Sequence, residues 1–367
     1  MYSQNDLDEA VAAGALSADS ANALRAFVDQ QRATPAVDEE QFRLITGFND
    51  IFVSIAAAIL LFAVGFIGQT IGRATGTTLE LDGPSPLGPL SVAATAWGLA
   101  LFFTAKRRMA LPSILLLLAF VGGVFATAAL TIGVLVGAAF FENNEQMVFI
   151  VMAVAAAIAA AGAYAHWKRF RVPITIAAGA GAVAGLAAAL VASALPDTPD
   201  RYDILMGLTL LLGVGMFLFA MRWDSSDPAR VTRRSDVAFW LHLLAAPMIV
   251  HPIFTLLGLR DNSATVAEGL AVIVLYVVLG LMALAIDRRA LLVSALAYVL
   301  FALKQLFDQF GAVELNVALT ALVIGSALLL LSAFWHQARA MVVRPLPDSL
   351  KARLPLIDRK VVTAPAA

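Results

Sequence analysis

The chain has 367 residues, of which 60% are apolar and only 14% are charged, and its formal net charge is −1. Soluble domains are typically about 45–50% apolar and about 25% charged, so this composition excludes an ordinary cytosolic enzyme and also a disordered chain. The class that remains is an all-α membrane protein that crosses the bilayer many times. The balanced net charge argues against nucleic acid as a partner.

The sequence shows no motif for a metal, a cofactor or a known catalytic site. The chain has no cysteine, and its four histidines lack the spacing of a zinc site. Neither a Walker loop nor a Gly-x-Ser-x-Gly turn occurs. We therefore expect no metal and no cofactor, and nothing in the sequence argues for an enzyme.

Residues 1–46 predict a polar helical hairpin with a linker. Leu7 and Val11 share one helical face, and Gly14-Ala15-Leu16-Ser17 then forms a turn. Ser17 is a suitable N-cap for a second helix over about residues 18–32, and Thr34-Pro35 begins the linker. The hairpin region has eight acidic residues and three basic ones, so it is a candidate surface for a cytoplasmic protein partner.

Ten apolar segments follow, and all but the third are close in length to the roughly 20 residues that a membrane-spanning helix needs. They cover about 51–72, 88–105, 110–138, 147–166, 173–195, 203–221, 237–258, 265–286, 290–308 and 315–335. The third segment is too long for one upright helix. It contains Pro112, Gly122, Gly123, Gly133 and Gly137, so either one tilted or kinked helix or a broken helix accounts for it.

The distribution of basic residues fits ten spans with both termini in the cytoplasm. On this count, 21 of the 25 basic residues lie in the two terminal regions and the even-numbered connections. Only Arg73, Arg201, Arg260 and Lys304 lie toward the other side. This is the bias of the positive-inside rule. The predicted domains are therefore the hairpin and linker at 1–46, a transmembrane bundle at 47–336 and a basic cytoplasmic tail at 337–367.

The tail contains six basic residues against Asp348 and Asp358, and its prolines exclude one long helix. It is a candidate for binding anionic lipid headgroups. Alternatively, its charge only enforces the topology.

Spans 1–4 and 7–10 resemble each other weakly, which suggests a parallel internal repeat. Lys106-Arg107-Arg108 joins spans 2 and 3, while Asp287-Arg288-Arg289 joins spans 8 and 9. Span 4 ends with His166-Trp167, and span 10 ends with Trp335-His336. The alternative is convergence, because membrane helices generally end in basic and aromatic residues.

Ionisable residues inside a membrane are candidates for function. Span 7 contains His242 and His251, with Pro247 and Pro252 as possible hinges. Together with Glu268, Lys304 and Asp308, the second histidine is expected near the outer ends of spans 7–9. These residues could form a substrate or proton pathway. The alternatives are histidines bonded to nearby carbonyls, and lysine and acids that only anchor the helices in interfacial water.

Small residues at four-residue spacing predict close helix packing in lipid. Gly133 and Gly137 form one such pair, and Gly181 and Gly185 form another. The Gly-rich run around Gly181 superficially matches a dinucleotide-binding fingerprint. That interpretation fails because no strand precedes the run and no acidic ribose partner follows it in a soluble βαβ unit.

The order of short helix, Gly14-Ala15-Leu16-Ser17 turn, second helix and many spans resembles a family of bacterial multi-pass inner-membrane proteins with a domain of unknown function. The resemblance covers Asp6 to Arg32. It implies the bacterial inner membrane and offers no catalytic residues. Three functions stay open: a small-solute or ion transporter, a non-transporting scaffold, sensor or assembly factor, and, least favoured, an intramembrane lipid-modifying enzyme.

Overall fold

The computed structural model describes residues 11–24, 48–142, 144–228, 230, 232–256, 266–289, 292, 296, 325–326, 332 and 334–355. Its regular secondary structure in these residues is entirely helical. The helices are α3 (Phe48–Ala74), α4 (Leu87–Phe103), α5 (Ala110–Val136), α6 (Ala138–Glu142), α7 (Glu145–Phe170), α8 (Ile174–Ala194), α9 (Arg201–Ser225), α10 (Arg233–Leu256), α11 (Val266–Ile286), α14 (Trp335–Val343) and α15 (Asp348–Lys351).

The chain divides into two units, residues 1–42 with 358–367 and residues 43–357. In the smaller unit, the described part shows the predicted turn between two helical segments. Gly14 has a φ of +69°, a conformation that glycine adopts without strain. The Ser17 hydroxyl accepts a hydrogen bond from the Ser20 backbone N–H at 3.1 Å, which confirms Ser17 as the N-cap.

Six helices of the larger unit are long and apolar enough to cross a membrane: α3, α5, α7, α8, α9 and α10. They establish a multi-pass helical membrane protein. Helix α4 is also apolar but has only 17 residues. Eight of the ten predicted spans coincide with helices. The ninth and tenth lie almost entirely outside the described residues, so the count of ten and the internal repeat stay predictions.

The outward faces of these helices are strongly apolar. Phe48, Phe62 and Leu135 are 82%, 77% and 79% exposed. Such side chains are stable on an outer surface when the solvent is hydrocarbon, and a helix satisfies its own backbone hydrogen bonds there.

The long third segment forms one helix, and the break comes at its end. Helix α5 has 27 residues and is therefore about 40 Å long, which exceeds the about 30 Å thickness of the hydrocarbon core and requires tilt. Pro112 lies in its first turn, where no intrahelical hydrogen bond is lost. Gly137 ends the helix with a φ of +89°, and its N–H bonds to the Gly133 carbonyl at 2.8 Å.

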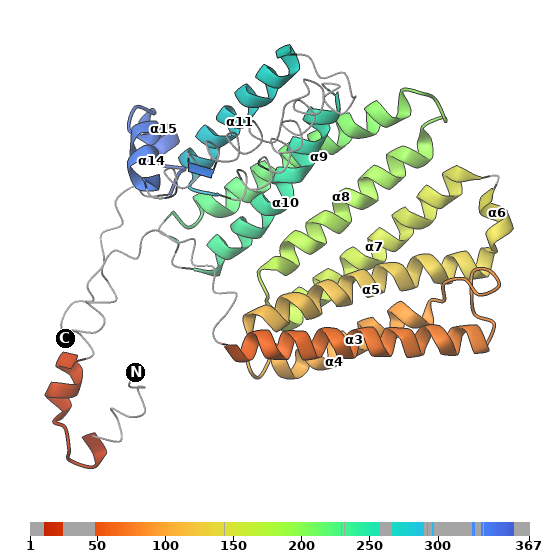
Figure 1. Ribbon diagram of the computed structural model, residues 1–367, viewed down its shortest axis with the longest axis horizontal. Coiled ribbons are helices and arrows are strands. Elements are labelled where there is room, and N and C mark those ends of the chain that lie inside the picture. Colours follow the sequence, from red (N-terminus) through yellow and green to blue (C-terminus); the bar gives the residue numbers. More distant parts are fainter. Residues whose placement is uncertain are drawn as a thin grey trace, which may run out of the picture. The chain divides into compact units, whose positions relative to one another are not determined.

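Helices adjacent in sequence pack as antiparallel neighbours in the order α3, α4, α5, α7, α8, α9 and α10 (Figure 1). Small residues fill the contacts, and Ala96, Ala155 and Ala245 are fully buried. A Cβ at Gly213 would lie 2.8 Å from the Met248 backbone, so α9 and α10 approach each other closely at this glycine. Close backbone approach through small residues is how helices associate in lipid.

Candidate functional site

The second half of the bundle contains a buried charged group at the end where α9 stops and α10 starts. Its centre is Asp224, in the last turn of α9, which is 1% exposed. His242 from α10 is fully buried, and its Nε2 lies 3.0 Å from Asp224 Oδ2. The imidazole edge packs on the Phe217 ring, with 5.2 Å between the ring centroids. The Nδ1 atom of His242 is buried without a hydrogen-bond partner.

Arg288 joins the same carboxylate from the turn after α11. Its Nη2 donates to Asp224 Oδ1 at 2.5 Å, and its Nε donates to Oδ2 at 3.2 Å. The Nη2 atom also donates to the Ser235 carbonyl at 3.0 Å. Arg288 is 2% exposed, so this two-point contact is almost completely removed from solvent. We call Asp224, Ser235, His242 and Arg288 the Asp224 cluster.

A second buried charged group is centred on Asp287, the residue directly before Arg288. Its Oδ2 accepts from Arg230 Nη1 at 2.8 Å, and its Oδ1 accepts from the Trp335 indole at 2.7 Å. Arg339 from α14 lies 3.9 Å from the same Oδ1 and donates to the Pro355 carbonyl at 2.6 Å. We call Asp287, Arg230, Trp335 and Arg339 the Asp287 cluster. It attaches residues 335–355 to the turns after α9 and α11.

The backbone at this second cluster adopts an uncommon conformation. Arg230 has a φ of +53° and Asp287 a φ of +56°, both in the left-handed region. In this arrangement, Arg230 Nη2 donates to the carbonyls of Ile286 and Asp287, each at 2.9 Å. The Arg230 guanidinium therefore binds the end of α11 at two kinds of acceptor, the Asp287 carboxylate and two backbone carbonyls. Left-handed non-glycine residues are costly and persist where surrounding contacts hold them.

The two clusters place two carboxylates opposite three guanidinium groups and one imidazole. Desolvating these charges costs several kcal/mol per ion, and only good geometry and further hydrogen bonds offset it. The clusters therefore fix the relative positions of α9, α10, the turn after α11, and α14. Of these three kinds of side chain, imidazole is the one whose ordinary pKa lies near the physiological range.

Sequence reasoning identified His242 but missed the rest of both clusters. Asp287, Arg288 and Trp335 enter the sequence analysis as parts of the possible internal repeat, and the basic residues otherwise serve there only to indicate topology. One available clue is position: Asp287 directly follows the apolar segment 265–286, and Asp224 follows the segment 203–221 after only Arg222 and Trp223. An acidic residue near basic residues at the end of a predicted helix is a candidate for an ion pair.

The predicted outer group of His251, Glu268, Lys304 and Asp308 is described only in part. His251 lies half-buried in α10 and has a partner of its own. Glu268 lies in the first turn of α11, while Lys304 and Asp308 fall outside the described residues. Pro247 and Pro252 both lie inside α10, which continues through them. Whether these residues form a pathway or a hinge stays a prediction.

The predicted packing glycines have different surroundings. A Cβ at Gly181 would lie 3.4 Å from Leu244 in α10, and one at Gly133 would lie 3.0 Å from Leu79. A Cβ at Gly185 would meet nothing within 4 Å, and Gly137 forms the end of α5.

The first half of the bundle has a buried histidine, His166, that contacts no charged group among the described residues. His166 Nδ1 lies 3.3 Å from the Thr175 hydroxyl, and its ring packs on Phe170 at 4.5 Å between centroids. Trp97 and Phe120 lie within 6.0 Å of the same ring. This surrounding is aromatic, in contrast to the Asp224 cluster.

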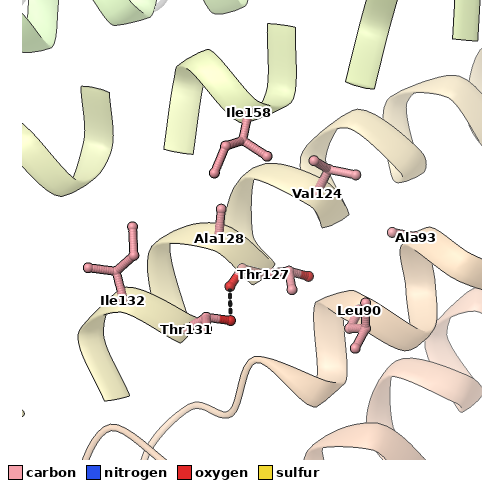
Figure 2. Close-up of a pocket in the computed structure, with 8 residues that line it drawn as sticks. All are labelled: Leu90, Ala93, Val124, Thr127, Ala128, Thr131, Ile132 and Ile158. Carbon is pink, nitrogen blue, oxygen red and sulfur yellow. Dashed lines mark hydrogen bonds between the residues drawn. The ribbon is translucent and has the colours of Figure 1, made fainter. Parts of the chain in front are cut away.

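A cavity of about 370 Å³ lies between α4, α5 and α7 (Figure 2). Its lining residues are Leu90, Ala93, Val124, Thr127, Ala128, Thr131, Ile132 and Ile158. The hydroxyls of Thr127 and Thr131 donate to the carbonyls of Gly123 and Thr127, each at 2.6 Å, so they bond within their own helix. The cavity therefore offers a ligand an almost purely apolar surface.

Comparison with protein-family models, with curated proteins and with solved structures finds no match for this chain. The class of protein is therefore defined by the fold alone: six long apolar helices make it an integral membrane protein with several spans. The resemblance of Asp6 to Arg32 to a family of inner-membrane proteins stays a prediction. Within the described residues, no three histidine or acidic side chains are placed to hold a metal ion.

Proposed function

We propose that this integral membrane protein is a small-solute or ion transporter of the inner membrane, with both termini in the cytoplasm. The observation that carries the proposal is the fully buried Asp224–His242–Arg288 contact, which combines a titratable imidazole with a matched ion pair at the end of a helical bundle. Buried ionisable groups in membrane helices are expensive and typically mark ion or proton pathways.

The surroundings of His242 support a role in that pathway. Charged groups act on it from three segments: Asp224 from α9, Arg230 from the connection between α9 and α10, and Arg288 from the turn after α11. Protonation of the imidazole adds a positive charge next to a carboxylate already paired with a guanidinium. That change alters the contacts that hold α9, α10 and the turn together, and α10 also contains Pro247 and Pro252. The outer group of His251, Glu268, Lys304 and Asp308 belongs to the proposal as the opposite end of the pathway.

The test is flux in reconstituted vesicles. Purified full-length protein is placed in vesicles, and the uptake of isotope-labelled Na⁺, K⁺, neutral sugars and neutral amino acids is measured in turn, with a pH-sensitive dye inside to report proton flux. At least one probe should enter faster than in protein-free vesicles. His242→Gln should slow that flux and reduce its pH dependence, while Gly215→Ala, at a position with open space, should not. Equal rates in wild-type and protein-free vesicles for every probe would refute transport.

A non-transporting scaffold, sensor or assembly factor is the second candidate. It is favoured by the apolar lining of the cavity between α4, α5 and α7, which offers no polar route in that part of the bundle. In this function the hairpin at 1–46 would bind a cytoplasmic protein partner. The charged tail would add membrane contact, although Arg339 is buried at Asp287 and Lys351 pairs with Asp348 at 3.3 Å. Capture of one defined partner that is lost on deletion of residues 1–40, without flux, would favour this alternative.

A further inference from the structure

We propose that the connections α4–α5 and α7–α8 together form a binding site for the headgroups of anionic phospholipids. The site consists of six basic residues: Lys106, Arg107, Arg108, Lys168, Arg169 and Arg171. All six are exposed, and residues 104–109 and 168–173 contain no acid. This surface is separate from the Asp224 and Asp287 clusters, and the inference does not depend on transport.

The two connections are brought together by a shared aromatic contact. Phe170, the last residue of α7, lies 5.1 Å from Trp97 of α4 between ring centroids. Phe170 and Phe103, the last residue of α4, pack on the same buried cluster, which includes Leu61 and Leu116. The basic residues that adjoin these two phenylalanines therefore lie on one continuous surface at one end of the bundle.

Among the described residues the six cations have no acidic partner, in contrast to the buried arginines. Arg201, Arg230 and Arg288 each form an ion pair with a carboxylate, at 3.1, 2.8 and 2.5 Å. Within the described part of the chain, none of the six exposed residues has such a pair. A cluster of like charges repels itself, so its favourable state is one with anions bound from outside.

Four of the six cations are held over aromatic rings. Arg107 lies 5.5 Å from the Phe102 centroid and Lys168 lies 5.0 Å from that of Tyr164. Arg169 and Arg171 lie 5.5 Å from the Phe170 and Trp167 centroids. Contacts within about 6 Å attract a cation to the ring face and reduce the side chain's freedom. Aromatic residues collect at the level of lipid headgroups, so this arrangement holds the charges at the depth of phosphate groups.

Two of the six basic residues have a left-handed backbone conformation, which glycine adopts more easily than arginine. Arg108 and Arg171 have φ values of +54° and +56°, and Arg171 is the C-cap of α7. Glycine is the residue that commonly takes this left-handed position at a helix end. An arginine there is strained, and its exposed side chain makes no ion pair with any residue that the structure describes. Arginine at these two positions is explained if its positive charge interacts with a bound anion.

The position of the six basic residues favours the headgroups of membrane lipids as the anions that bind them. The site adjoins α5 and α7, which are long enough to span the bilayer, and basic surfaces between membrane helices commonly bind anionic headgroups. The positive-inside rule predicts both connections on the cytoplasmic side, where the leaflet carries anionic lipid. Several adjacent cations further favour a headgroup with more than one phosphate.

The experiment is lipid competition on the full-length protein in neutral detergent. Native mass spectrometry measures the adducts formed with an equimolar mixture of phosphatidylglycerol and phosphatidylcholine, with cardiolipin in a parallel series. Wild-type protein should bind the anionic lipids preferentially. The triple variant Arg107→Gln, Lys168→Gln, Arg171→Gln should bind them about 100-fold more weakly, because each well-placed basic residue contributes measurably to headgroup binding.

A matched control replaces three other exposed arginines by glutamine: Arg222 near the end of α9, and Arg233 and Arg234 at the start of α10. Unlike the six basic residues of the site, these arginines have acids close by in the sequence, namely Asp227 and Asp236. The control should change binding less than twofold; an equal loss in both triples would overturn a local site. Displacement of the lipid by millimolar inorganic phosphate would overturn lipid as the source. If the first triple does not fold, wild-type protein in rising salt decides, because anionic-lipid preference must fall as charges are screened. A preference that is absent, or independent of salt, refutes the proposal.

Discussion

At the scale of single residues, the Asp224 carboxylate is the counterion of buried Arg288 and the hydrogen-bond partner of buried His242. It accepts both contacts from Arg288 and one from His242, and all three side chains are at most 2% exposed. Removal of the carboxylate charge leaves a guanidinium without a counterion in a site that excludes water. Removal of all three polar groups leaves no such charge. The second change should therefore destabilise the protein less than the first, although it alters more atoms.

We expect Asp224→Asn to lower the free energy of unfolding by about 3–5 kcal/mol, because Arg288 becomes an unpaired buried charge. The combined variant Asp224→Leu, His242→Leu, Arg288→Met should lie closer to wild type. Equilibrium unfolding by SDS in mixed micelles measures both. An Asp224→Asn variant as stable as wild type would show that water or another group already compensates Arg288.

A similar argument applies to the Trp335 indole, which donates to Asp287 Oδ1 at 2.7 Å and is 3% exposed. Trp335→Phe keeps an aromatic six-membered ring but removes the five-membered ring that carries the N–H donor. We expect a loss of about 1–3 kcal/mol, because a buried carboxylate loses a hydrogen bond. In limited proteolysis, residues 335–355 should become more accessible than in wild type, and unchanged cleavage would contradict a role of this bond in attaching α14.

At the scale of elements, the helices associate through small residues. The α9–α10 contact depends on Gly213, where a Cβ would lie 2.8 Å from the Met248 backbone. Backbone cannot move aside as a flexible side chain can. Gly207 and Gly215, on the same helix, have nothing within 4 Å of a built Cβ. One helix therefore supplies both a critical glycine and its controls.

We expect Gly213→Ala to destabilise the protein by about 1–3 kcal/mol through overpacking. Gly215→Ala should leave stability unchanged or raise it, because alanine has the better helix propensity. Thermal unfolding in detergent, followed by tryptophan fluorescence, compares the two. Equal midpoints would mean that α9 and α10 are separated more widely than the structure shows.

The helices could be predicted from the sequence, because hydrocarbon solvent forces apolar runs of defined length to be helical. The predicted span 203–221, for example, lies within α9. The clusters could not be predicted in the same way. Asp224 and Arg288 are separated by 64 residues, and their contact depends on how α9, α10 and the turn after α11 pack. Periodicity reports which face of a helix is apolar and does not identify a partner on another helix.

At the scale of the whole molecule, charge differs between the two ends of the bundle. The α4–α5 and α7–α8 connections expose only basic residues among their charged side chains. The opposite connections, α3–α4 and α8–α9 with the start of α9, expose acids, namely Glu80, Asp82, Asp197, Asp200 and Asp203. Arg201, which lies among them, is buried and pairs with Glu145. An electrically polar bundle inserts with its basic end on the cytoplasmic side.

The natural chain has no cysteine, so single introduced thiols report this orientation without a background signal. We expect Leu81→Cys and Thr198→Cys, at exposed sites of the acidic end, to react with a membrane-impermeant maleimide on intact cells whose outer membrane is permeable to it. Ser226→Cys and Arg107→Cys, at the basic end, should react only after the inner membrane is opened. Labelling of all four before opening would mean leaky cells or a mixed topology, and labelling of only the second pair would invert the bundle. With inversion, the basic surface would face the outside, and the cytoplasmic leaflet could not supply its lipid.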